Sequence, residues 1–187
     1  MRWSPAVAAA VAAVALATLL AAAPSRAFEA FLGDYVGAAE LTDVESGAVE
    51  ARDVTTTIER FGEGGFKIRW TSVILVDGRR DVRGVRRVVR ELAFEPAGDG
   101  GYFLQAPDYD PFRLREPLEP MAGDALAWAT VAGERMDVFV FALRQSGASE
   151  LQHHRRTLTD LGLDLAYRGL VDVEIVTRGA GRMVRVD

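Results

Sequence analysis

A β-hairpin is predicted between Asp124 and Leu143, and it constrains the fold more than any other stretch of the chain. The segment Ala132-Gly133-Glu134-Arg135 places glycine at the first of two central turn positions, as a type II′ turn requires. That turn fixes the register of the two strands. One face of the hairpin then carries the following cross-strand pairs: Leu126 with Phe141, Trp128 with Phe139, and Thr130 with Asp137.

The opposite face of this hairpin is small and apolar. It consists of Ala125, Ala127, Ala129, Val131, Met136, Val138, Val140 and Ala142. A hairpin with two apolar faces needs both of them covered, which favours the wall of a closed or sandwiched sheet over a sheet with one face in water. The pattern does not decide which face points inward.

The N-terminus has the pattern of a secretory signal peptide. Arg2 precedes an unbroken apolar run from Ala6 to Ala23, and Ser25-Arg26-Ala27 ends in a small-x-small cleavage pattern. We therefore expect residues 1–27 to be a signal peptide and residues 28–187 to form a single domain. An uncleaved membrane anchor is the alternative, but alanine is only weakly apolar.

Composition narrows the environment and the partners. Removal of residues 1–27 takes away two arginines and no acid, so the net charge moves from −5 to −7, which argues against nucleic acid as a partner. There is no cysteine, which excludes disulfides and thiolate metal sites. We expect a periplasmic or secreted bacterial protein with no integral membrane span after processing.

The rest of the chain reads as a series of short antiparallel strands. Alternating residues predict strands near 33–41, 53–59 and 66–74, and Asp77-Gly78 marks a second two-residue turn. Residues 82–94 fit either a strand or an amphipathic helix, and their valine content favours a strand. Further strands are expected at 102–106, 149–158, 163–168, 171–177 and 183–186, while four prolines make 107–123 a loop and a plausible lid. This predicts an all-β fold, an antiparallel up-and-down barrel of about nine or ten strands, with a β-sandwich as the alternative.

A chain of serial hairpins that opens with Phe31-Leu32-Gly33-Asp34-Tyr35 resembles the lipocalin or broader calycin barrels. Gly33-Asp34-Tyr35 stands where lipocalins carry Gly-x-Trp, and the resemblance implies that Arg168 closes the barrel base against this aromatic ring. Pro107-Asp108-Tyr109 shares two residues with the middle lipocalin motif. The chain is also similar in size and type to exported proteobacterial proteins.

The sequence offers no catalytic constellation. Neither a nucleophile elbow, a zinc-protease motif nor a phosphate-binding loop is present. The adjacent residues His153 and His154 would point to opposite faces of a strand, so they cannot readily share a metal or a substrate. We therefore expect a protein that is not an enzyme, with no catalytic residue, no metal site and no cofactor.

Two features carry the binding hypotheses. An aromatic set either forms ordinary core or lines an apolar ligand cavity; it comprises Trp70, Tyr102, Trp128, Phe139 and Phe141. An arginine cluster between Arg79 and Arg90 is either a solvated edge or a site for an anionic group. The prediction is an exported, non-enzymatic barrel that binds a hydrophobic or amphipathic small molecule. The alternatives are a structural or protein-interaction component of the envelope without a cavity and, less favoured because Arg86-Arg87 and Arg155-Arg156 charge both strand faces, an outer-membrane barrel.

Overall fold

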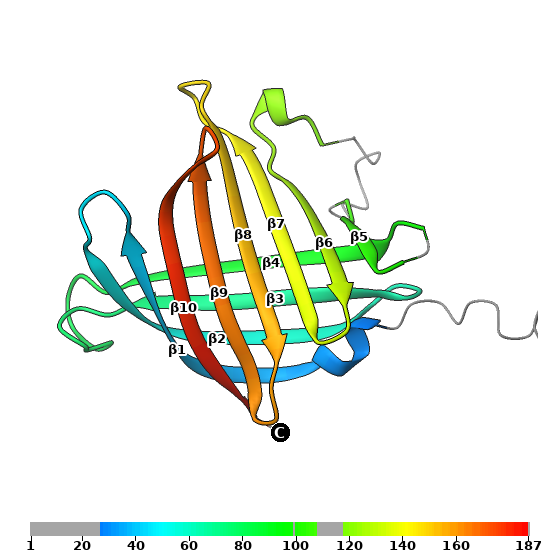
Figure 1. Ribbon diagram of the computed structural model, residues 1–187, viewed down its shortest axis with the longest axis horizontal. Coiled ribbons are helices and arrows are strands. Elements are labelled where there is room, and N and C mark those ends of the chain that lie inside the picture. Colours follow the sequence, from blue (N-terminus) through cyan, green and yellow to red (C-terminus); the bar gives the residue numbers. More distant parts are fainter. Residues whose placement is uncertain (1–26, 99, 108–117, 187) are drawn as a thin grey trace, which may run out of the picture.

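The chain forms a closed antiparallel β-barrel (Figure 1). The computed structural model describes residues 27–98, 100–107 and 118–186. Within these residues each strand pairs with its sequence neighbours, and β1 pairs with β10 to close the barrel, so the predicted barrel is confirmed and the sandwich alternative is wrong. The strands are β1 (Gly33–Asp43), β2 (Val49–Phe61), β3 (Gly65–Ile74), β4 (Arg86–Pro96), β5 (Tyr102–Gln105), β6 (Leu126–Ala132), β7 (Arg135–Leu143), β8 (Ser149–Leu158), β9 (Gly162–Val171) and β10 (Glu174–Val186).

The predicted central hairpin is confirmed as β6 and β7. Leu126 pairs with Phe141 and Trp128 with Phe139, and the turn residue Gly133 has φ +57°. The face that points into the barrel is the small one, because six of its residues belong to the buried core: Ala127, Ala129, Val131, Met136, Val138 and Val140. The large aromatic face therefore lies on the outside of the barrel.

The ambiguous segment after the second turn is a strand, β4, as its valine content indicated. Asp77 and Gly78 have φ +51° and +72° and form the expected two-residue turn, closed by a single bridge between Val76 and Arg79. The strand does not resume directly after this turn. Ile74 pairs with Arg86, because the chain between these residues is longer than a tight hairpin allows. Arg69 therefore faces Glu91, whereas a strand that resumed directly after a tight turn would have placed Arg86 opposite it.

The two strands predicted at 171–177 and 183–186 are one continuous strand, β10, so that prediction was wrong. Gly179 and Gly181 lie within it and not in a turn. A Cβ at Gly181 would lie 2.5 Å from the carbonyl oxygen of Ala38, which explains why glycine is needed where β1 and β10 approach each other. The turn before β10 is formed by Asp172 and Val173.

Two expected segments fall largely outside the described residues. Residues 1–26 of the predicted signal peptide are not described, and neither are residues 108–117 of the proline-rich loop. The described part of that loop contains the short 3-10 helix η2 (Pro120–Ala122). Within the described residues, no helix has the length and apolar character needed to cross a membrane.

One end of the barrel is filled by a cluster of aromatic side chains. The 3-10 helix η1 (Ala27–Phe31) lies against this end and buries Phe28 and Phe31 (Figure 1). Phe28 lies 5.5 Å from Phe66 and 5.9 Å from Phe103, measured between ring centroids. The apolar core is therefore concentrated at the end that η1 closes.

An arginine secures this closed end, but it is not the one that the lipocalin resemblance implied. Arg185 lies over the Tyr35 ring at 5.2 Å, and its Nη2 donates hydrogen bonds to the Tyr35 hydroxyl and the Ala30 carbonyl at 2.6 and 2.7 Å. Arg168 is exposed and pairs with His153 in β8 and Arg178 in β10. Arg185 occupies this position because β10 returns to pair with Tyr35.

We expect Val173→Gly to stabilise the protein. Val173 has φ +69° and its side chain is 88% exposed, so it bears the strain of a left-handed conformation without contributing to packing. Removing that strain, less the added entropy of glycine in the unfolded chain, should raise the free energy of unfolding by about 1 kcal/mol. Urea unfolding of the two proteins measures the difference.

Gly133→Val makes the opposite change, from glycine to valine, in the turn between β6 and β7. Gly133 has φ +57°, so a β-branched side chain there should lower the free energy of unfolding by roughly 1–3 kcal/mol. Equal stability of both variants and the parent would contradict the turn conformations described here.

Candidate ligand-binding cavity

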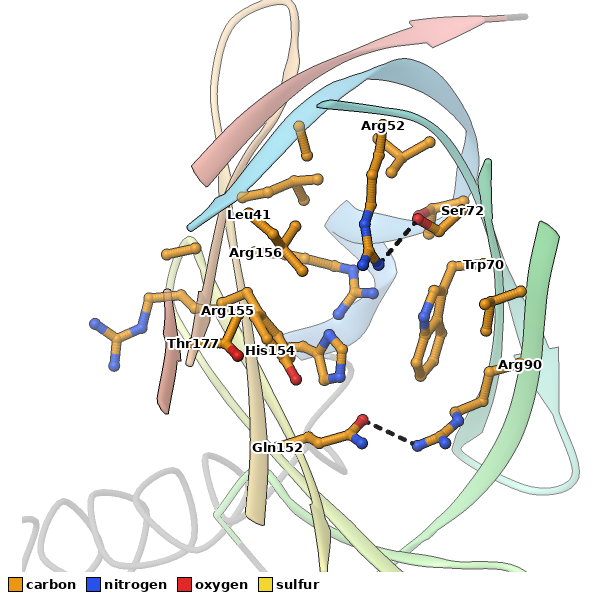
Figure 2. A pocket seen from close by; sticks show the side chains of 17 residues that line it. Leu41, Arg52, Trp70, Ser72, Arg90, Gln152, His154, Arg155, Arg156 and Thr177 are labelled. Atoms are coloured by element: carbon orange, nitrogen blue, oxygen red, sulfur yellow. Dashed lines mark hydrogen bonds between the residues drawn. The ribbon is translucent and has the colours of Figure 1, made fainter. Parts of the chain in front are cut away.

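The other half of the barrel interior contains a cavity of about 340 Å³. Side chains from seven strands on both sides of the barrel surround it (Figure 2). Its lining is Ala39, Leu41, Arg52, Val54, Thr56, Trp70, Ser72, Val88, Arg90, Gln152, His154, Arg155, Arg156, Leu165, Ala166, Tyr167 and Thr177.

Strand β8 supplies the polar side of this cavity. Gln152, His154 and Arg156 alternate along the strand and therefore share its inward face. The intervening Arg155 points the other way, with its guanidinium away from the cavity, and its Nε donates to Asp137 at 2.7 Å (Figure 2). The apolar end begins just beyond Arg156, where Leu158 packs against the core.

Arg156 is a buried cation at the floor of the cavity. The residue is 4% exposed, and its guanidinium lies 5.3 Å from the centroid of the Trp70 ring. The Nε and Nη1 atoms are buried and have no hydrogen-bond partner among the described residues. Burial lowers the pKa of Arg156 to about 10, so the side chain stays positively charged at neutral pH.

The other two inward arginines do have partners. Arg52 Nε donates to Glu50 Oε1 at 2.7 Å, and Arg52 Nη1 lies 3.5 Å from Ser72 Oγ. Arg90 Nη1 donates to Gln152 Oε1 at 3.2 Å (Figure 2). Both arginines therefore have their own hydrogen bonds, whereas Arg156 relies on its contact with Trp70.

His154 lies between two aromatic rings on the same wall. Its ring centroid is 5.1 Å from that of Trp70 and 4.9 Å from that of Tyr167. Its Nε2 atom is buried without a hydrogen-bond partner among the described residues. Burial, and then the positive charges of Arg156 and Arg90, hold the pKa of His154 well below 6.5, so the imidazole is neutral.

The charged side chains that line the cavity are all positive. None of its lining residues is aspartate or glutamate, and three of them project positive charge into it. Within the part of the chain that the structure describes, no group of three or more acidic or histidine side chains is arranged to hold a metal ion. The lining combines hydrophobic walls with buried hydrogen-bond donors, which suits an organic molecule bearing a polar group.

The structure separates the five aromatic residues of the predicted ligand set. Trp70 lines the cavity. Tyr102, Trp128, Phe139 and Phe141 lie on the alternate positions of their strands and face outward, so the expectation that Trp128, Phe139 and Phe141 form the cavity wall is corrected. The reason is steric: the interior beside β6 and β7 is already filled by core residues, and the inward side chains of these two strands are alanine, valine and Met136, with no aromatic ring. Whether any of the five contacts a ligand stays a prediction.

The outward aromatic rings form their own stack on the barrel surface. Trp128 stacks on Phe139 at 5.2 Å, and Phe139 stacks on His153 at 4.5 Å. His153 Nε2 lies 2.6 Å from Oδ1 of Asp137, which is 5% exposed. Burial raises the pKa of Asp137, but hydrogen bonds from Arg155 and His153 outweigh it and lower the pKa. The two adjacent histidines do point to opposite faces, as the sequence predicted.

The polar residues of the cavity were not identified from the sequence. Arg90 was grouped with five other arginines, but it alone of that cluster lines the cavity, while Arg80 and Arg86 form ion pairs with Asp53 and Glu50. The sequence feature that could have indicated a polar cavity was the pair Arg155-Arg156 in a predicted strand. Alternation requires one of these two arginines to point inward.

No protein family matches the chain, and no curated protein sequence matches it. Among solved structures it is similar to the S-type phycobiliprotein lyase CPES from Guillardia theta, with a TM-score of 0.37 and 8% sequence identity over 86% of this chain and 90% of that chain. The strand pairing itself defines the class, a closed ten-stranded antiparallel barrel with an internal cavity.

We expect the protein to lose stability as the pH falls below 6.5, and His154 to be a cause. The unfolded chain binds a proton at this histidine near pH 6.5, whereas the folded chain, with its lowered pKa, does not. The free energy of unfolding should therefore fall by up to about 1.4 kcal/mol per pH unit below 6.5. Urea unfolding between about pH 7.5 and pH 5, where carboxylates remain ionised, measures the slope.

His154→Phe keeps an aromatic ring between Trp70 and Tyr167 and removes the titrating group. Its unfolding free energy should depend less on pH over the same interval. An unchanged slope would show that the pH dependence arises elsewhere.

Proposed function

We propose that this protein is a non-enzymatic barrel that binds an amphipathic small molecule in the half of its interior opposite η1. The observation that carries the proposal is the internal cavity, which the aromatic cluster at the other end leaves unfilled. A barrel with a purely structural role gains nothing from placing unpartnered polar atoms inside such a cavity, because each one costs stability.

The size of the cavity limits the ligand. A volume of about 340 Å³ is at the lower end of small-molecule sites. At roughly 30 Å³ per water molecule it corresponds to about eleven waters, or to an organic ligand of roughly ten to fifteen non-hydrogen atoms. A longer chain would extend past the strand ends into solvent.

The chemistry of the walls indicates a molecule with distinct apolar and polar parts. Leu41, Val54, Val88 and Leu165 provide apolar surface, while β8 presents Gln152 and its neighbours as hydrogen-bonding groups. The Trp70 ring lies beside both kinds of surface. This combination supports binding of an amphiphile over binding of a fully hydrophobic compound.

Fluorescence of Trp70 is the direct test. The chain has three tryptophans, so the Trp3→Phe, Trp128→Phe variant leaves Trp70 as the only one. Titration with a ten-carbon amphiphile such as decanoate or 1-decanol should change the intensity or wavelength of Trp70 emission saturably, because the ring lines the cavity.

The matched control is the Trp3→Phe, Trp70→Phe variant, in which the outward Trp128 reports. Its emission should not respond to the same titration. A response from Trp128 alone would place the ligand on the outer surface. Silence from both reporters, with no rise in melting temperature, would favour the structural or interaction role and overturn the proposal.

We further propose that the protein is exported to the periplasm or secreted after cleavage following Ala27. The basis is the sequence pattern of residues 1–27. Expression of the full chain in a bacterial host should yield a product whose N-terminal sequence begins at Phe28. A chain that retains Met1 and stays with membranes after carbonate washing would contradict export.

A further inference from the structure

We infer that the ligand carries an oxyanion, a carboxylate or a phosphate, and that Arg156 binds it at the floor of the cavity. This inference rests on the proposed function and specifies its ligand class. The observation behind the inference is that the positively charged Arg156 side chain is buried and that its Nε and Nη1 atoms have no acceptor among the described residues.

The state of Arg156 in the folded chain is unfavourable. A buried cation ordinarily has a carboxylate or a set of carbonyl oxygens to accept its hydrogen bonds. The guanidinium of Arg156 lies over the Trp70 ring, and its Nε and Nη1 atoms are buried without an acceptor among the described residues. An oxyanion would supply the missing negative charge and the missing acceptors together, and a guanidinium binds one in a two-pronged geometry.

Three other arginines near the cavity have hydrogen-bond acceptors of the kind that Arg156 lacks among the described residues. Arg155, the next residue along the strand, is hydrogen-bonded to Asp137 on the outer face. Arg52 is hydrogen-bonded to Glu50, and Arg90 to Gln152. The chain thus provides acceptors for its other strand arginines near the cavity but none for Arg156 among the described residues, which marks the position as one completed by a ligand.

The surroundings of Arg156 favour an anion over a neutral polar group. No residue of the cavity lining is acidic, and Arg90 adds positive charge from the facing strand β4, while Arg52 of β2 is ion-paired with Glu50. In a cavity of low dielectric constant these charges act on a ligand far more strongly than they would in water. The neutral His154 beside Arg156 can also donate a hydrogen bond to the head group in the tautomer that carries its proton on the buried Nε2.

The geometry also orients the ligand. Arg156 is next to the apolar core, since the following inward residue of β8, Leu158, packs against it. The head group would therefore enter first and the hydrocarbon part would lie along Leu41, Val54 and Val88 toward the strand ends.

Calorimetric titration of the full chain with decanoate, decyl phosphate and 1-decanol tests the inference. The three probes share a ten-carbon chain and differ in the head group. At least one of the two anions should bind about tenfold or more tightly than the alcohol. The tighter of the two anions identifies the head group as carboxylate or phosphate.

Arg156→Met is the decisive variant, because methionine keeps much of the side-chain length without the charge. It should bind the preferred anion about tenfold or more weakly and bind 1-decanol within about threefold of the parent. Without ligand it should melt at a higher temperature than the parent, since an uncompensated buried charge is gone. Arg156→Gln serves the same purpose if the methionine variant does not fold.

The matched control is Arg168→Met, an exposed arginine on the outer face of the neighbouring strand β9 that does not line the cavity. It should bind the anion as the parent does. Equal affinity of the parent for all three probes, or an Arg156→Met variant that keeps its preference for the anion, would overturn the inference while the proposed function stands. Failure of the parent to bind any of the three probes would overturn both.

Discussion

The aromatic cluster around Phe28 and Phe31 determines how the barrel interior is divided. These two side chains come from η1, outside the strands, and pack on Phe66 and Phe103 at one end. Fully burying a phenylalanine contributes about 1.5–3 kcal/mol, so this cluster is a large share of what stabilises the fold. Because that end is filled, the other half of the barrel does not need to be filled as well.

The unfilled half has a composition that packing alone does not explain. A core selected only for stability would place aliphatic residues at positions 90, 154 and 156. The chain instead places two arginines and a histidine there, and nitrogen atoms of Arg156 and His154 have no hydrogen-bond partner in the part of the chain that the structure describes. Buried polar groups of this kind lower the free energy of unfolding, and a bound molecule that supplies their missing hydrogen bonds offsets that loss. If the proposed ligand binds Arg156, the stability of the empty protein and the affinity for that ligand are therefore set against each other at the same residue.

Much of the fold follows from local sequence rules, and the parts that do not follow have identifiable causes. The β6–β7 register was predictable because glycine in a two-residue turn leaves one pairing, and the structure has that pairing. The continuous β10 was not predictable. Gly179-Ala180-Gly181 has the composition of a turn, and only its long-range contact with Ala38 and Ala39 of β1 reveals why glycine is required. The register between β3 and β4 was also not predictable, since a correct turn at Asp77-Gly78 says nothing about the length of the chain between that turn and the next strand.

The cavity was harder to predict than the fold because large aromatic residues were taken as the markers of a binding site. The inward positions on β6 and β7 are occupied by alanine, valine and Met136, so the bulky aromatic residues of that hairpin lie outside. The informative residues were instead the charged ones in β8. His153-His154 and Arg155-Arg156 are each a pair of identical residues in one strand. Because side chains alternate along a strand, one member of each pair points inward and the other outward. The outward members, His153 and Arg155, meet Asp137, whereas the inward members meet a cavity with no acidic residue. Arg155 is thus paired with a carboxylate on the outer face, whereas the charge of Arg156 on the inner face has no acidic partner among the described residues, which is the arrangement expected where an anionic ligand completes the inner face.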